Sequence, residues 1–154
     1  MLSKICKKTG NPGLGFESEP TVVKQANKLL KNTDVTVELG NISELNGVWE
    51  DVVMLMQCHV FHDFTPEQKC IEIMNSYLTS FPNLKCFFYI DTVTPSPAHN
   101  ELFPGFDYVH GLLGIPTRTY EETQEMFKNS KFKMIKEVPL DLPNTFIWLL
   151  APKN

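Results

Sequence analysis

Apolar and polar positions along the chain follow two different periods. Two segments carry apolar residues at the 3.6-residue period of a helix with one buried face, and they predict helices that begin near Pro20 and near Thr65 or Pro66. Proline suits the first turn of a helix because it has no N–H group there to leave unpaired. The apolar positions are Val22, Val23, Ala26, Leu29 and Leu30 in the first helix, and Cys70, Ile71, Met74, Tyr77, Leu78 and Phe81 in the second.

Shorter apolar runs lie between these helices and predict strands. Four of them cover residues 14–17, 35–39, 52–57 and 86–90. The runs at 52–56 and 86–90 are continuously apolar, which is typical of strands buried on both faces of a parallel sheet. These strands alternate with helices, so the sequence predicts a parallel arrangement covered by helices on both sides.

The C-terminal third of the chain has a different pattern. Residues 107–113 predict a short helix, and Thr119 caps another, with acidic residues in its first turn where the helix dipole favours them. Two strands follow at 131–139 and 145–151, joined closely enough to form an antiparallel pair. The fold class expected is therefore α/β: a Rossmann-like sheet, mostly parallel, with an antiparallel C-terminal strand.

Composition narrows the class of protein. The 154 residues, 42% of them apolar, suit a single domain over 1–154 that needs no disulfide to hold its core. A net charge of −4 argues against nucleic-acid binding, and no run approaches the roughly 18 apolar residues of a membrane span. The N-terminus has no apolar run like that of a signal peptide, so we expect a cytoplasmic protein. The four cysteines form no C-x-x-C pair and are expected to be buried thiols.

Unusual polar residues gather where the predicted strands end. Glu17 ends the first strand, Asn41 follows the second, His62 and Asp63 follow the third, and Asp91 ends the fourth. Ligands of parallel sheets bind beyond the carboxyl ends of the strands, so these side chains are expected to line one cleft.

Three segments are similar to motifs of one family. Cys58-His-Val-Phe-His-Asp-Phe-Thr-Pro-Glu67 is similar to the family's "L-H-D-W-x-D-E" segment after the fourth strand. Phe106-Asp-Tyr and Arg118-Thr-Tyr-Glu-Glu122 are similar to its substrate helix and to the "R-T-x-x-E-W" start of the next helix. Gly15-Phe-Glu-Ser-Glu-Pro20 is similar to the acidic end of its second strand. The chain thus resembles the C-terminal portion of class I S-adenosylmethionine-dependent methyltransferases, most of all the O-methyltransferase group that includes the caffeic acid enzymes.

The resemblance also implies a departure. The family's first strand and glycine-rich loop would precede residue 1, and residues 1–10 correspond to the end of the helix after that loop. The glycines near residue 13 are no replacement, because the fingerprint follows a strand and opens a helix. We therefore expect a partial methyltransferase domain that binds cofactor weakly and has exposed sheet edges, through which it forms homodimers or other assemblies.

The cofactor implied by the resemblance is S-adenosylmethionine. Glu17 would accept hydrogen bonds from the ribose hydroxyls, and Asn41, where the family usually has Asp, would contact the adenine amino group. Ile42 and Cys58 would lie beside the same ligand. The alternatives are a surface acid near a helix N-terminus for Glu17 and an ordinary turn residue for Asn41.

His62 is the candidate catalytic residue implied by the resemblance. Its imidazole would be the general base that takes a proton from the acceptor, a role that suits a pKa near neutrality. Asp91 occupies one of the two positions that orient this base in the family, whereas the other falls at about Thr117 and lacks a carboxylate. Asp63 would orient the loop or cap the next helix beside the acceptor. The alternative for His62 is a structural histidine at a strand end.

The substrate helix contributes two further candidates, Asp107 and His110. A second imidazole facing His62 would bind the acceptor's carboxylate, or would form half of a two-histidine metal site completed by a 2-oxo acid. The alternative is a histidine packed on its helix. His59 is expected to face the opposite side from His62 if the strand continues.

Two functions remain open on the sequence. The first is methyl transfer from S-adenosylmethionine to a small-molecule acceptor, at a hydroxyl or at a carbon next to a keto group. The second is a non-catalytic homologue that acts as an interaction or regulatory module.

Overall fold

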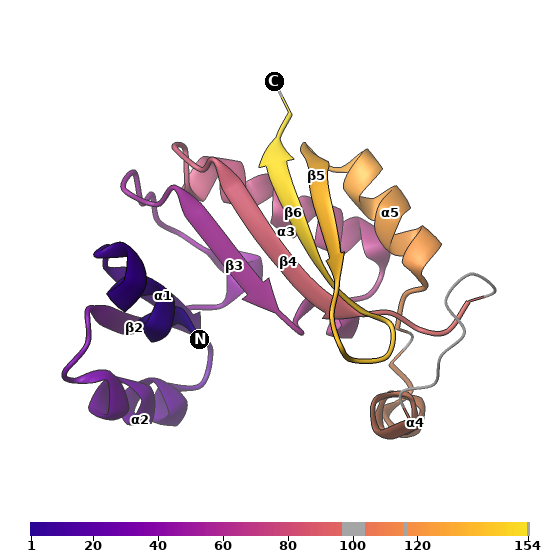
Figure 1. The fold of residues 1–154 in the computed structure, drawn as a ribbon, viewed down its shortest axis with the longest axis horizontal. Helices are drawn as coiled ribbons and strands as arrows, with labels where there is room; N and C mark the ends of the chain where they lie inside the picture. The colour runs from indigo at the N-terminus through magenta and orange to yellow at the C-terminus, as the bar shows by residue number, and fades with distance from the viewer. Residues whose placement is uncertain (97–103, 116, 154) are drawn as a thin grey trace. The chain divides into compact units, whose positions relative to one another are not determined.

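The computed structural model describes residues 1–96, 104–115 and 117–153, which Figure 1 colours along the chain. The chain divides into two compact units, Met1–Asn46 and Gly47–Asn154. Each unit is described here by itself. None of the helices in the described ranges is long and apolar enough to span a bilayer.

The first unit is built around a parallel pair of strands. It contains α1 (Leu2–Thr9), β1 (Gly13–Glu17), α2 (Pro20–Leu30), β2 (Val35–Leu39) and the short 3-10 helix η1 (Ile42–Glu44). Helix α2 crosses between the two strands, which pair in register from Gly13 with Val35 to Glu17 with Leu39. The side chain of Asn27 on α2 makes two hydrogen bonds with the backbone of Val37 in β2. Its amide nitrogen donates to the Val37 carbonyl at 2.6 Å, and its amide oxygen accepts the Val37 N–H at 2.9 Å.

Helix α2 begins as predicted, but its apolar face is not buried within this unit. Glu19 is the N-cap and Pro20 stands in the first turn. Leu29 nevertheless remains 85% exposed, and Val22 remains 44% exposed. A two-stranded sheet offers too little apolar surface to cover the whole face of the helix.

The second unit has a four-stranded mixed sheet. Its elements are β3 (Met54–Cys58), the 3-10 helix η2 (Phe61–Asp63), α3 (Glu67–Ser80), β4 (Cys86–Thr92), α4 (Pro104–Leu113), α5 (Tyr120–Asn129), β5 (Phe132–Pro139) and β6 (Thr145–Pro152). The strands lie in the order β3-β4-β6-β5 (Figure 1). β3 and β4 are parallel, whereas β6 is antiparallel to both of its neighbours.

The predicted α/β class is confirmed, with parallel strands and an antiparallel C-terminal pair. The single continuous sheet is not observed, because the strands fall into one sheet in each unit. Thr119 caps α5 as predicted and forms a reciprocal pair with Glu122: the Glu122 N–H donates to the Thr119 hydroxyl, and the Thr119 N–H donates to the Glu122 carboxylate.

Three interlocking aromatic rings form the centre of the second unit. Tyr89 of β4 lies 5.1 Å from Phe127 of α5 and 5.6 Å from Trp148 of β6, measured between ring centroids. All three residues are at most 2% exposed. Burial of a large apolar side chain contributes about 1.5–3 kcal/mol, so this cluster ties α5 to the middle of the sheet.

The two outer strands of this sheet differ in how they face solvent. β5 carries Lys133, an irregularity between Met134 and Lys136, and Pro139, all of which discourage pairing with another strand. β3 has no charge, proline or bulge, and Met54 is 37% exposed. The prediction that residues 52–56 are buried on both faces is wrong for Val53 and Met54, which are 52% and 37% exposed. The outer edge of β3 is a separate feature, because β3 pairs with β4 alone among the described residues.

Candidate active site

The strongest polar contact at the end of β3 joins His62 to Asp91. Asp91 Oδ1 lies 2.7 Å from His62 Nδ1, and both residues are nearly buried, at 7% and 2% exposure for His62 and Asp91. The Thr92 N–H and the Tyr89 hydroxyl also donate to the Asp91 carboxylate. An ionised carboxylate only accepts, so His62 donates through Nδ1, and in the neutral imidazole the lone pair is on Nε2.

Charge around His62 acts against the effect of burial. Burial by itself lowers the pKa of this imidazole. The hydrogen bond and the negative charge of Asp91 then raise it, and the charge of Asp63 adds to them. The outcome is a pKa of His62 above its ordinary value, although the positive charge of Arg118 opposes the rise.

His110 of α4 faces His62, and its imidazole is held in the same way, through a hydrogen bond at Nδ1. Its Nδ1 lies 2.7 Å from the carbonyl oxygen of Phe106, one turn earlier in the helix. A carbonyl oxygen only accepts, so Nδ1 donates and Nε2 keeps its lone pair. The Nε2 atoms of His110 and His62 lie 3.7 and 3.5 Å from the same Asp63 oxygen, Oδ1.

His62, Asp63 and His110 form one of two groups among the described residues whose ligand atoms lie close enough to share a metal ion; the other is His59, His62 and Asp91. One ligand atom from each of His62, Asp63 and His110 lies within 4.8 Å of the other two. Two ligands at about 2.1 Å from an ion stand about 3.0–3.4 Å apart, so small side-chain movements would close the site. Two imidazoles with one carboxylate suit Fe²⁺ and neighbouring transition metals. Histidine ligands of metal sites are usually oriented by a hydrogen bond from the ring nitrogen that does not bind the ion. The Nδ1 bonds of His62 to Asp91 and of His110 to the Phe106 carbonyl are of this kind.

His59 also lies close to this cluster, contrary to the sequence-based expectation. β3 ends at Cys58, and His59 adopts a left-handed conformation with φ of 51°. This turn brings its Nδ1 to 3.6 Å from Asp91 Oδ1 and its ring centroid to 6.0 Å from that of His62. The expectation of opposite faces assumed a continuing strand, and a left-handed residue has no signal in the apolar pattern.

Other predicted residues of the second unit lie around the histidines. Cys58 ends β3 and is exposed, so the expectation of a buried thiol is wrong for this residue. Partial desolvation and the charge of Asp91 still raise the pKa of its thiol. Thr117, at the position of the absent carboxylate, is hydrogen-bonded to the hydroxyl of Thr94. The Phe106 ring lies 4.0 Å from His110 and 5.2 Å from His62, centroid to centroid. The side chain of Asp107 falls outside the described part of the structure.

Three of the four residues predicted to hold the nucleoside, Glu17, Asn41 and Ile42, lie in the first unit, whereas Cys58 lies in the second. Glu17 and Asn41 are neighbours there, because the Gly40 N–H donates to the Glu17 carbonyl at 2.9 Å. One Glu17 carboxylate oxygen accepts the Glu19 N–H. The Asn41 side-chain oxygen accepts two bonds from Ser43 at the start of η1, where Ile42 is the first residue. In this state Asn41 acts as the turn residue that the sequence left as its alternative.

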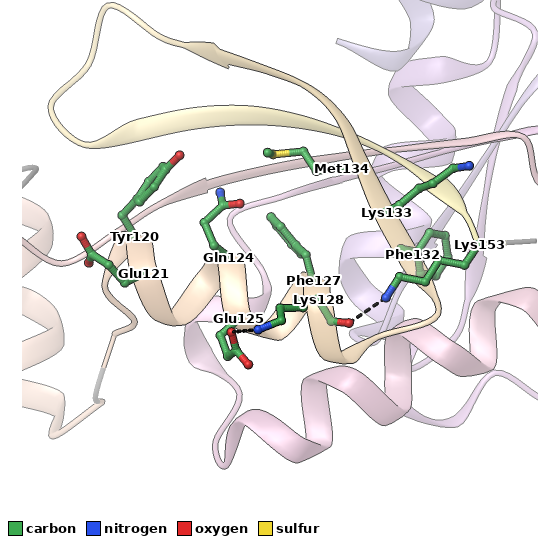
Figure 2. Close-up of a pocket in the computed structure, with 10 residues that line it drawn as sticks. All are labelled: Tyr120, Glu121, Gln124, Glu125, Phe127, Lys128, Phe132, Lys133, Met134 and Lys153. Carbon is green, nitrogen blue, oxygen red and sulfur yellow. Dashed lines mark hydrogen bonds and ion pairs between the residues drawn. The ribbon is translucent and has the colours of Figure 1, made fainter.

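A separate groove lies between α5 and β5 (Figure 2). It has a volume of about 540 Å³, with Phe127, Phe132 and Met134 among its apolar lining residues. Lys128 pairs there with Glu125 at 3.3 Å. The groove contains none of the predicted site residues.

Comparison with known proteins relates the chain to methyltransferases. No family model matches the sequence. The chain is 28% identical over 160 residues to indolepyruvate C-methyltransferase of Streptomyces griseus, a match that covers 99% of this chain and 49% of that protein. The chain therefore spans about half the length of this curated relative.

Solved structures share the fold. Mitomycin 7-O-methyltransferase MmcR superposes with a TM-score of 0.73 at 19% identity, over 94% of this chain and 42% of that one. LepI in complex with S-adenosylmethionine gives a TM-score of 0.73 at 14% identity, over 98% and 39% of the two chains.

Proposed function

We propose that the protein transfers a methyl group from S-adenosylmethionine to a carbon next to the keto group of a 2-oxo acid. The proposal is supported by similarity over 99% of this chain to indolepyruvate C-methyltransferase and by the fold shared with solved methyltransferases. The bond to the sulfonium sulfur breaks as the new carbon–carbon bond forms. The acceptor carbon gives up one proton to water, and S-adenosylhomocysteine leaves.

One observation carries the choice of a 2-oxo acid. The Nε2 atoms of His62 and His110 converge on the Asp63 carboxylate, each with its lone pair free and its Nδ1 held by another group. The keto oxygen and carboxylate of a 2-oxo acid are adjacent donors that can share one ion with these side chains. A divalent metal bound there would polarise the keto group, which makes the neighbouring carbon more acidic. Indolepyruvate, named in the relative from Streptomyces griseus, is such an acid.

The other residues have supporting roles in this proposal. Asp91 fixes the ring of His62, and the Phe106 carbonyl fixes that of His110. The Phe106 ring offers an apolar surface for the acceptor's side chain. Glu17, Asn41 and Ile42 would hold the nucleoside end of the cofactor, with Asn41 exchanging its bonds to Ser43 for the adenine amino group. Methyl transfer is an in-line displacement, so most of the rate enhancement would come from orientation.

A second function uses the same residues without a metal. His62 Nε2 would take the proton of an acceptor hydroxyl while Asp91 stabilises the imidazolium that forms. This O-methylation gives no role to Asp63 and His110 as a pair, and their convergence with His62 favours the first proposal.

The products of the reaction distinguish the two functions. The protein is incubated with S-adenosylmethionine and indolepyruvate, or with a phenol, and the position of the new methyl group is read by mass spectrometry and NMR. We expect a C-methylated 2-oxo acid, loss of product with a chelator, and recovery on addition of Fe²⁺. Methylation of the phenol that is indifferent to the chelator would support the second function and contradict the first.

A further inference from the structure

Arg118 makes an unusual set of contacts in the second unit. It is the single arginine of the chain and lies just before α5, with 8% of its surface exposed. Its Nη1 donates to the Phe61 carbonyl at 2.7 Å, and its Nη2 donates to the Phe64 carbonyl. Nη2 also lies 3.1 Å from the sulfur of Cys70 on α3. Hydrogen bonds from a charged donor are about twice as strong as neutral ones.

The two carbonyls are at the ends of the segment that carries His62 and Asp63. Phe61 begins η2, and Phe64 follows it directly. The backbone bonds within this turn are few, with the Phe64 N–H donating to Phe61 at 3.0 Å and the Asp63 N–H reaching Val60 only at 3.4 Å. A turn this short has little stability of its own, so bonds from outside it decide where its side chains point.

The backbone of Arg118 is fixed to the strand that carries Asp91. The Thr94 N–H, just beyond β4, donates to the Arg118 carbonyl at 2.7 Å, and Thr94 pairs with Thr119 in an isolated bridge. One residue therefore joins the extension of β4 to the turn that holds His62. The 2.7 Å contact between His62 and Asp91 spans these same two segments.

We infer that Arg118 is a positioning residue, whose guanidinium holds both ends of the 61–64 turn so that His62 and Asp63 face His110. The role in methyl transfer rests on the proposed function, whereas the role in orienting His62 does not. Lysine cannot replace arginine here, because the planar guanidinium presents two parallel donors and an ammonium group is a single point. The substitution Arg118→Lys, which keeps the charge and loses the paired donors, therefore distinguishes a positioning role from a need for positive charge alone.

The test compares Arg118→Lys and Arg118→Met with Phe132→Leu, a buried change in β5 away from the turn. The readout is the downfield NMR signal of the His62 Nδ1 proton that bonds to Asp91, assigned by its loss in His62→Gln. We expect a sharp signal in the wild type and in Phe132→Leu, and loss or a marked shift of the signal in both Arg118 variants. Affinity for Co²⁺ should fall by about 10–100-fold in the same two variants, as it does when outer contacts of metal ligands are removed.

The two proposals fail in different ways. An unchanged His62 signal in Arg118→Lys would overturn the positioning role, whatever the activity of the protein. If Arg118→Met does not fold, Arg118→Lys still decides the question, because it keeps the buried charge. A shifted signal in Arg118→Lys together with a wild type that binds no Co²⁺ would support the positioning role and contradict the metal-assisted function.

Discussion

The imidazole of His110 stands edge-on to that of His62, with ring centroids 4.9 Å apart and planes at 76°. One ring comes from α4 and the other from the turn after β3, yet each donates through Nδ1 to an acceptor of its own and directs Nε2 toward Asp63. The pair is therefore preorganised before any ligand arrives.

Removal of His110 should weaken metal binding without affecting the cofactor. We expect His110→Ala to reduce Co²⁺ affinity by at least about tenfold, because one of three ligands is lost. His59→Ala is measured beside it, since His59 belongs with His62 and Asp91 to the second candidate group; a loss in His59→Ala without a loss in His110→Ala would place the ion in that group instead. Both are measured by the visible absorption of bound Co²⁺. Equal affinity in His110→Ala and the wild type would contradict a two-histidine site.

His62 should matter for chemistry and not for cofactor affinity. In the active protein, His62→Ala should lower the rate of methyl transfer, by at least about tenfold if His62 is a metal ligand and by about 10²–10⁴ if it is the general base of the second function. Calorimetric titration with S-adenosylhomocysteine should give nearly the same affinity as the wild type. Full activity in His62→Ala would show that the histidine is structural.

Glu17 should show the opposite division of effects. Glu17→Ala removes the carboxylate proposed to bind the ribose hydroxyls, so affinity for S-adenosylhomocysteine should fall while Co²⁺ affinity stays the same. Glu38→Ala on the neighbouring β2 is a control for loss of one acidic side chain. If Glu17→Ala and Glu38→Ala bind the nucleoside equally well, Glu17 is only a surface acid near a helix.

Metal affinity should depend on pH in a direction set by His62. Its pKa is raised above the ordinary value of about 6.5, and the additional proton goes to Nε2 because Nδ1 already carries one. Protonation removes the lone pair that a metal needs. Co²⁺ affinity should therefore be at its full value above the raised pKa and should fall as the pH drops through it. Asp91→Asn removes the charge that raises the pKa and should move this loss to lower pH. A shift to higher pH in Asp91→Asn would contradict the assigned cause.

The exposed edge of β3 should promote self-association of this chain. It presents Met54 and Val53 to solvent, at 37% and 52% exposure, with no strand partner among the described residues on that side. Met54→Lys should shift the chain toward monomer in sedimentation experiments, because a charge disfavours edge-to-edge pairing. Ile135→Lys on β5 is the control, since that edge already has an irregular register and lysines. A chain that is monomeric at all concentrations before mutation would exclude association through this edge.

Much of the local structure could be predicted from the sequence. Apolar periodicity located α2 and α3, short apolar runs located the strands approximately, and Pro20 and Thr119 marked two helix starts. These features depend on neighbours within a few positions, where steric and hydrogen-bonding preferences act directly. The clustering of His62, Asp63 and Asp91 at strand ends followed from the same reasoning.

What the sequence could not decide depends on segments far apart in the chain. The exposure of β3, the inward turn of His59 and the convergence of His110 on Asp63 all follow from strand order and from one left-handed residue. The contacts of Arg118 could not be predicted either, because the carbonyls that it binds, those of Phe61 and Phe64, are too far away in the sequence for a local pattern to relate them. Periodicity reports which face of an element is apolar, whereas only the tertiary packing determines which polar groups meet. The sequence by itself therefore predicted the elements and the kinds of residue at the site, and the tertiary structure decided their geometry.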